Sequence, residues 1–139
     1  MKRLAHASAC LALFALMCLA LAPAGAQDDK FPDVKSIMGK LNKGPKAMTK
    51  TLSKDLAADE PDWDKVQKDA KEFARLAKMM GKKEPPKGEK ESWEKLTKQY
   101  AEYAQALSEA ADKKDKAAAK AAHGKLSTAC KSCHSQHKQ

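Results

Sequence analysis

The sequence predicts an all-α fold, an antiparallel four-helix bundle in a single domain. Apolar residues recur at steps of three and four in four long segments, which is the spacing of amphipathic helices. Short stretches rich in proline, glycine or charge separate these segments, and no stretch alternates apolar and polar residues as a strand would. Amphipathic helices joined by short connections pack as an antiparallel bundle.

The first predicted helix covers residues 33–53. Its apolar stripe consists of Val34, Ile37, Met38, Leu41, Pro45, Met48 and Leu52. Proline inside a helix removes a backbone hydrogen bond and clashes with the preceding turn. The Gly44-Pro45 pair therefore predicts a kink or a split near residues 42–45.

The second predicted helix runs from Pro61 to about Met80. Proline suits the first turn of a helix, because its missing N–H would have no partner there. The apolar positions are again three or four residues apart: Trp63, Val66, Ala70, Phe73, Ala77 and Met80. Gly81 is suited to stop the helix. Residues 82–89, with two prolines and a glycine, predict an irregular loop.

The third predicted helix extends over about residues 93–111, and the fourth over about residues 114–137. We expect Asp112 or Asp115 to cap the start of the fourth helix, since aspartate accepts hydrogen bonds from free backbone N–H groups. The apolar face of this last helix is mostly alanine. Such small residues let a flat ligand or a neighbouring helix approach closely.

The N-terminus predicts a secretory signal peptide. Two basic residues precede an apolar run over about residues 9–21, and small residues ending at Ala26 form a cleavage pattern. The run is shorter than a membrane-spanning helix requires, so we expect cleavage and no stable membrane anchor. The expected organisation is residues 1–26 as the signal and residues 27–139 as one exported, periplasmic domain.

The chain is basic. Its 139 residues carry a formal net charge of +9, and loss of Lys2 and Arg3 with the signal leaves +7. Lysine at this density is typical of a solvated surface, and it also suits an acidic redox partner, because complementary charge speeds encounter. We do not expect nucleic-acid binding, since the chain lacks arginine clusters and aromatic stacking platforms.

The segment Cys130-Lys131-Ser132-Cys133-His134 carries the chemistry of the chain. Two cysteines three residues apart lie on one face of a helix, where each thiol can add to one vinyl group of the same porphyrin. The adjacent His134 is then held beneath the iron as proximal ligand. The signal contains the other two cysteines, so no disulfide framework remains. One such motif predicts one covalently attached haem c.

Two other interpretations use the same cysteines. A zinc site could recruit His123, Cys130, Cys133 and His137. A redox dithiol is the second, although such a pair usually accompanies a βαβ pattern that this sequence does not show. The adjacent His134 and the export signal favour haem over both.

A single C-x-x-C-H motif near the C-terminus of a four-helix chain resembles the class II cytochromes c, the family of cytochrome c′ and cytochrome c-556. The resemblance covers nearly the whole chain after the signal. It implies that Cys130 and Cys133 bind haem covalently and that His134 ligates its iron. It also implies that Lys138, where arginine is common, lies near a haem propionate; a solvated terminal lysine is the alternative.

The resemblance further implies that the first helix covers the distal face of the haem. A methionine at the sixth position of the iron gives an electron carrier, whereas an apolar residue leaves five-coordinate iron open to small gases such as nitric oxide and carbon monoxide. Met38 is the candidate ligand. The Gly44-Pro45 break departs from the family pattern, and a shifted alignment would place Leu41 there instead.

From these observations we expect a periplasmic monohaem cytochrome that carries single electrons. A five-coordinate, gas-binding protein is the alternative, and a helical bundle without haem is a third hypothesis. No catalytic acid, base or nucleophile is needed, so we do not expect an enzyme. The resemblance implies that two copies can pair as a homodimer, although the sequence gives no interface.

Overall fold

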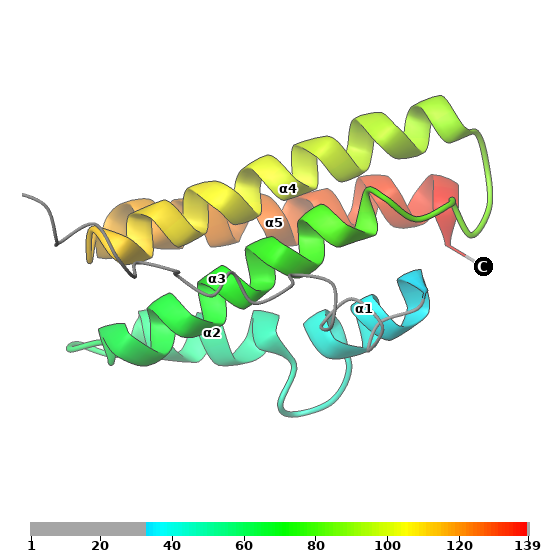
Figure 1. Ribbon diagram of the computed structural model, residues 1–139. Helices are drawn as coiled ribbons and strands as arrows, with labels where there is room; N and C mark the ends of the chain where they lie inside the picture. Colours follow the sequence, from blue (N-terminus) through cyan, green and yellow to red (C-terminus); the bar gives the residue numbers. More distant parts are fainter. Residues whose placement is uncertain (1–32, 139) are drawn as a thin grey trace, which may run out of the picture.

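The computed structural model describes residues 33–138, and these residues form α-helices and no strand (Figure 1). The five helices are α1 (Val34–Asn42), α2 (Met48–Ala57), α3 (Trp63–Met80), α4 (Lys90–Asp112) and α5 (Lys116–His137). The predicted all-α class is confirmed. The predicted signal, residues 1–26, lies outside the described residues.

Helices α2 to α5 form the predicted antiparallel four-helix bundle. Each packs against the next along the chain, and α2 also packs against α5, which closes the bundle (Figure 1). No Cα atom of α2 lies within 8 Å of α4, and none of α3 lies within 8 Å of α5. The helices of each of these two pairs therefore lie diagonally opposite each other in the bundle. In the described part of the chain, no helix has the length and apolar character needed to span a bilayer.

The first predicted helix is split in two, as the glycine–proline pair indicated. Residues 43–47 separate α1 from α2, and Gly44 has a φ of +85°, which favours glycine. Thr49 ties the two helices together: its Oγ1 lies 2.8 Å from the Leu41 carbonyl oxygen and 2.7 Å from Asn42 Oδ1. The direction of α1 is therefore fixed although the helix is interrupted.

Helix α3 begins two residues later than predicted. Asp62 is its N-cap, and the Asp62 carboxylate accepts a hydrogen bond from the Lys65 backbone N–H at 3.2 Å. Pro61 therefore precedes the cap, and its predicted place in the first turn is wrong. The physical reason is that an aspartate side chain satisfies a free backbone N–H, which a proline cannot do. The end of α3 at Met80, before Gly81, agrees with the prediction.

The remaining helices follow the predicted pattern with small shifts at their starts. Helix α4 begins at Lys90, three residues before the predicted start. Asp115 caps α5, with its carboxylate accepting from the Ala118 backbone N–H at 2.9 Å. Asp112 is instead the last residue of α4.

The core lies between α2, α3, α4 and α5, with one side of α1 added to it. Its largest fully buried apolar side chains are Ile37, Leu41, Leu52, Leu56, Phe73, Leu76, Met80, Leu107 and Leu126. The apolar residues that α1 contributes to the predicted stripe differ in how deeply they are buried. Ile37 and Leu41 enter the core, whereas Val34 and Met38 are only partly buried. This second side of α1 matters for the site described below.

The contacts of Thr49 lead to a prediction about stability. In Thr49→Val the Leu41 carbonyl loses its side-chain donor, and we expect the free energy of unfolding of the haem-loaded protein to fall by about 1–2 kcal/mol. Urea denaturation followed by circular dichroism measures this change. Thr51→Val is the matched control, because Thr51 Oγ1 donates only within α2, to the Met48 carbonyl at 3.1 Å. Equal losses in both variants would contradict the assigned link between α1 and α2.

Candidate functional site

A cavity of about 1000 Å³ lies between α1 and the C-terminal half of α5. It exists because α1 stays apart from that half of α5. No Cα atom of α1 lies within 8 Å of α4 or α5, whereas α2 packs directly on α5. Figure 1 shows α1 and the end of α5 at the same end of the bundle. The volume is at the upper end of the range for small-molecule sites, roughly 300–1000 Å³.

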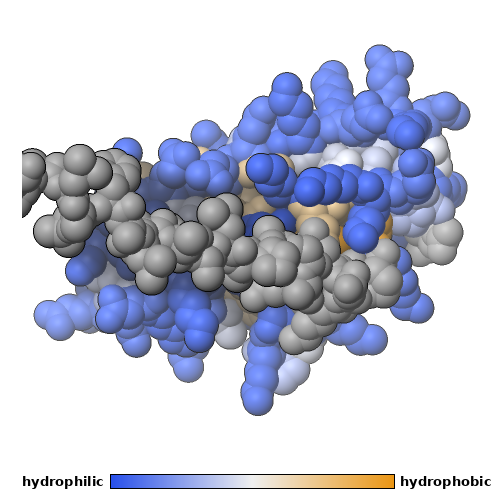
Figure 2. Space-filling model, viewed as in Figure 1, coloured by the Kyte–Doolittle hydropathy of each residue, from blue (hydrophilic) through white to orange (hydrophobic). Residues whose placement is uncertain are grey.

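The cavity has apolar walls and charged residues at its exposed positions. The apolar and aromatic lining comes from Val34, Met38, Met80, Pro86, Trp93, Leu96, Tyr100 and Ala129. The charged lining residues are exposed: Asp33, Lys35, Lys43 and Lys138. Figure 2 shows hydrophobic surface at this end of the molecule, framed by hydrophilic residues. Such a site suits a large apolar ligand with a polar edge.

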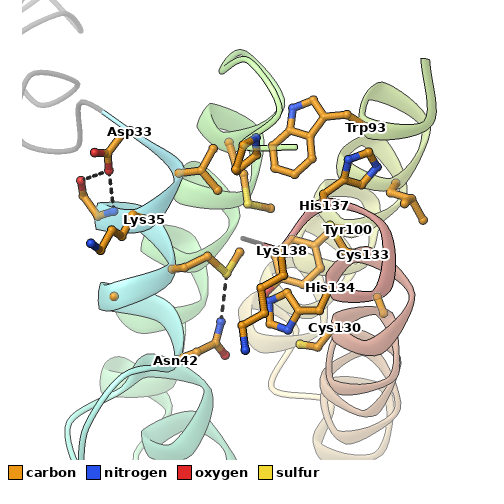
Figure 3. Close-up of a pocket in the computed structure, with 18 of the residues that line it drawn as sticks. Asp33, Lys35, Asn42, Trp93, Tyr100, Cys130, Cys133, His134, His137 and Lys138 are labelled. Atoms are coloured by element: carbon orange, nitrogen blue, oxygen red, sulfur yellow. Dashed lines mark hydrogen bonds between the residues drawn. The ribbon is translucent and has the colours of Figure 1, made fainter. Parts of the chain in front are cut away.

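Cys130 and Cys133 lie one turn apart on α5, and both line the cavity (Figure 3). Neither forms a disulfide, and both are partly buried. Burial raises the pKa of both thiols, and the charge of Cys130 adds to the effect on the pKa of Cys133. The structure therefore presents the two predicted haem-binding thiols, protonated at neutral pH, on one wall.

The three histidines of α5 differ in what their ring nitrogens bind. Nε2 of His123 lies 2.9 Å from the Thr49 carbonyl oxygen, and both ring nitrogens of His137 are hydrogen-bonded. The His134 ring makes no hydrogen bond within residues 33–138, and it lines the cavity next to Cys133. His134 is thus the histidine of α5 whose ring nitrogens are both available to a ligand in the cavity.

The zinc interpretation fails on this geometry. Among residues 33–138 no three or more histidine, cysteine, aspartate or glutamate side chains are grouped so that they could hold a metal ion. His123 and His137 are instead used to join helices and loops through backbone groups. The four-residue zinc set considered from the sequence is therefore not brought together.

Met38 reaches the cavity from α1, the wall that faces α5. Its Sδ accepts a hydrogen bond from Asn42 Nδ2 at 3.4 Å (dashed line in Figure 3). Leu41, the alternative distal residue, is 0% exposed in the bundle core and does not line the cavity. Val34 and Met38 lie along one edge of the apolar stripe of α1 and are only partly buried, whereas Ile37 and Leu41 lie along its other edge and are buried in the core. The role of Met38 as an iron ligand stays a prediction.

Lys138 follows the last turn of α5 and also lines the cavity. Its side chain is exposed, and Figure 3 shows it on the same side of α5 as His134. This position is compatible with the predicted role beside a propionate, which stays a prediction.

Aromatic residues of α4 complete the walls. Tyr100 and Trp93 are buried and also line the cavity. Burial raises the pKa of the Tyr100 phenol, the nearby Cys130 and Cys133 raise it further, and a hydrogen bond with Asn42 lowers it. The phenol therefore keeps its proton at physiological pH. Periodicity identifies such residues as apolar, but it does not tell which of them face a cavity.

His137 fastens the end of α5 to the preceding loop and to α4. Its Nδ1 donates to the Lys87 carbonyl at 2.6 Å, and its Nε2 lies 2.9 Å from Ser92 Oγ. The ring is only 3% exposed and packs edge-on against Trp93, with ring centroids 5.3 Å apart. Since His134 lies one turn earlier, these contacts hold the part of α5 that presents it.

Gly88 permits this close approach of the loop. Its φ is +81°, and a Cβ atom there would lie 2.9 Å from the Gln136 carbonyl oxygen and 3.0 Å from His137 Nδ1. A side chain is therefore excluded by conformation and by space. The sequence indicated only an irregular loop over residues 82–89, and the glycine was the one signal of this contact.

A bundle whose last helix presents C-x-x-C-H on the wall of an apolar cavity defines a class, the helical c-type cytochromes. A comparison with protein-family models matches residues 32–138 to the family described as Cytochrome C′. The match covers most of the chain, so the chain belongs to the cytochrome C′ family, and the predicted relationship is confirmed. Neither the curated proteins nor the solved structures contain a match to the chain.

Membership of this family makes the chain a c-type haem cytochrome, with haem c as the implied cofactor. The residues present fit that group. Two unpaired thiols lie one turn apart on the wall of a cavity of about 1000 Å³. The His134 imidazole, which makes no hydrogen bond to any of residues 33–138, lies beside them, and apolar side chains surround the space.

The contacts of His137 lead to a second prediction. His137→Phe keeps an aromatic ring but leaves the Lys87 carbonyl without its donor and removes one of the two hydrogen bonds of the Ser92 hydroxyl, so we expect a loss of about 2 kcal/mol in the free energy of unfolding. Urea denaturation of the haem-loaded protein measures it. Ser135→Ala is the control, because this exposed hydroxyl donates only within α5, to the Ser132 carbonyl at 2.9 Å. A loss in His137→Phe no larger than in the control would refute the anchoring role.

Proposed function

We propose that the chain is a periplasmic monohaem cytochrome that carries single electrons. The observation that carries this proposal is the position of Met38 on the wall opposite the one that bears His134. A thioether and an imidazole approaching from opposite walls can occupy both axial positions of one iron. Histidine–methionine ligation is typical of electron-carrying cytochromes and raises the reduction potential.

In this proposal Cys130 and Cys133 would hold one haem c covalently, with His134 and Met38 as axial ligands. When bound, the haem iron supplies a one-electron couple between its ferric and ferrous states. The apolar side chains of the cavity would surround the haem, and the ammonium group of Lys138 would pair with a propionate. Electron transfer needs no catalytic acid, base or nucleophile, so the proposed protein would be a carrier and not an enzyme.

Both proposed ligands come from elements that are held in place. Asn42 donates to the Met38 thioether, and Thr49 bonds to the end of α1. His137 anchors α5 one turn after His134. Ligands that keep their positions need little rearrangement when the charge of the site changes, which suits electron transfer.

Gas binding is the second candidate function, and one observation favours it. Asn42 Nδ2 already donates to Met38 Sδ at 3.4 Å. A thioether that remained in this bond would leave the sixth position of the iron open in an apolar cavity, where nitric oxide or carbon monoxide could bind.

The proposed location in the periplasm rests on the sequence of residues 1–26, with its basic start, apolar run and small-residue cleavage pattern. Pairing into a homodimer rests on the family resemblance alone. An acidic redox partner is part of the same proposal, and the net positive charge of the chain supports it.

The ligand assignment is tested by Met38→Leu, which conserves volume but removes the thioether. We expect the reduction potential to fall by on the order of 100 mV, measured by spectroelectrochemical titration, because axial ligands set the potential of haem iron. Met80→Leu is the matched control, since Met80 lines the same cavity from α3. An unchanged potential in Met38→Leu would exclude Met38 as a ligand, and a fall in the control alone would transfer that role to Met80.

Covalent attachment is tested by mass spectrometry of the protein exported together with the haem-attachment machinery. After acid denaturation we expect the mass of residues 27–139 plus one haem, because thioether bonds survive unfolding. The double variant Cys130→Ala, Cys133→Ala should have no added mass. Haem retained by the double variant, or an unmodified wild-type chain, would contradict the assignment.

A further inference from the structure

The charged residues are not evenly distributed among the helices. Residues 34–54, which form α1 and most of α2, contain six lysines and no aspartate or glutamate. Residues 116–138, which form α5 and its C-cap, contain five lysines and again no acidic residue. By contrast, residues 55–115, which include all of α3 and α4, hold 13 basic and 15 acidic residues.

These two lysine-only segments are neighbours in space. Helix α2 packs on α5, and the cavity lies between α1 and α5. Three of the lysines, Lys35, Lys43 and Lys138, line the cavity itself. Among the described residues that line the cavity, Asp33 is the only one with a carboxylate, and it accepts hydrogen bonds from the side chain and the backbone of Ser36. We call the surface formed by residues 34–54 and 116–138, with their lysines, the basic face.

The lysines of the basic face are exposed and unneutralised. Ten are exposed, at positions 35, 40, 43, 46, 50, 54, 120, 125, 131 and 138. None of these ten forms an ion pair within the described residues. Lys125 lies over the Tyr103 ring, with Nζ 5.8 Å from its centroid. On the other helices lysines do pair with acids, as in Lys71 with Asp112 at 2.8 Å.

A cluster of like charges repels itself and so does not stabilise the fold. Such a cluster is suited to an interaction outside the chain, with a surface of opposite charge. Protein interfaces commonly have an apolar centre and a polar rim, which matches an apolar cavity mouth surrounded by lysines. We infer that the basic face is the docking surface for a protein partner with an acidic surface, and that docking brings this partner to the cavity. This inference rests on the proposed function.

A membrane surface fits the basic face less well. Helices that lie on a bilayer present bulky apolar side chains for insertion beside their lysines. On α1, α2 and α5 the leucines and the isoleucine are buried in the core: Ile37, Leu41, Leu52, Leu56 and Leu126. Val34 and Met38 are partly buried and line the cavity. The exposed positions offer mainly lysine, serine, threonine and alanine. An acidic protein surface, which needs charge but no insertion, is the better match.

The experiment compares two triple variants of the full, haem-loaded protein with equal changes in net charge. One variant changes the basic face: Lys40→Glu, Lys43→Glu and Lys131→Glu. The control changes exposed lysines of α3 and α4: Lys68→Glu, Lys78→Glu and Lys98→Glu. Poly-L-glutamate is the acidic probe, and NMR titration at low ionic strength reports both the affinity and the residues that shift.

We expect the basic-face variant to bind poly-L-glutamate at least tenfold more weakly than the wild type, and the control variant less than threefold more weakly. The reason is that only the basic-face variant loses several exposed ion pairs between its lysines and the carboxylates of the probe. In the wild type the shifted amides should belong to α1, α2 and α5. The corresponding lysine-to-glutamine variants repeat the comparison if charge reversal disturbs folding. Equal weakening in the two variants would overturn the inference, since only net charge would matter.

The second part of the experiment measures binding of the same variants to vesicles that contain phosphatidylserine. Face-dependent binding to these vesicles without face-dependent binding to poly-L-glutamate would overturn the inference in favour of a membrane surface. The binding readout does not involve a change in the oxidation state of the iron. If the electron-carrier proposal fails, binding should still depend on the basic face. Failure of that proposal is therefore distinguishable from failure of the docking-surface inference.

Discussion

The separation of α1 from α5 is the constraint on which the site depends. A continuous helix in place of α1 and α2 would follow α5 as α2 does, and its side chains would fill the space that the thiols face. The break at residues 43–47 prevents this, and Thr49 holds α1 in its own direction. One side of α1 then contributes Leu41 to the core, while another side contributes Met38 to the cavity.

Helix α5 also contributes to both the core and the cavity, but from different parts of its length. Its first half supplies Leu126 and small buried residues to the core, and its second half presents two thiols and His134 to the cavity. The last turns of a helix tend to fray. The contacts of His137 with the Lys87 carbonyl and with Ser92 oppose that tendency at the end where a ligand must be held. His134 and His137, which are three residues apart, therefore have different tasks.

Features determined by neighbouring residues could be predicted from the sequence, and features determined by distant ones could not. The periodicity of residues 63–80 located α3 to within two residues, because an amphipathic face and an N-cap are local. The C-x-x-C-H motif is local as well. Met38 and Leu41, however, belong to one apolar stripe, and only the placement of α1 relative to α5 decides which of them lies on the cavity. The bond of His137 to the Lys87 carbonyl spans 50 residues, so no pattern along the chain predicts it.

The central claim of this account is that Met38 fills the axial position opposite His134 in the haem-loaded protein. The absorption spectrum of the exported protein tests it most directly, recorded oxidised, then reduced, and finally with carbon monoxide added. The account predicts low-spin spectra in both oxidation states and no change on adding carbon monoxide, because a thioether and an imidazole occupy both axial positions. A high-spin spectrum that shifts with carbon monoxide would contradict it and would assign the chain to gas binding.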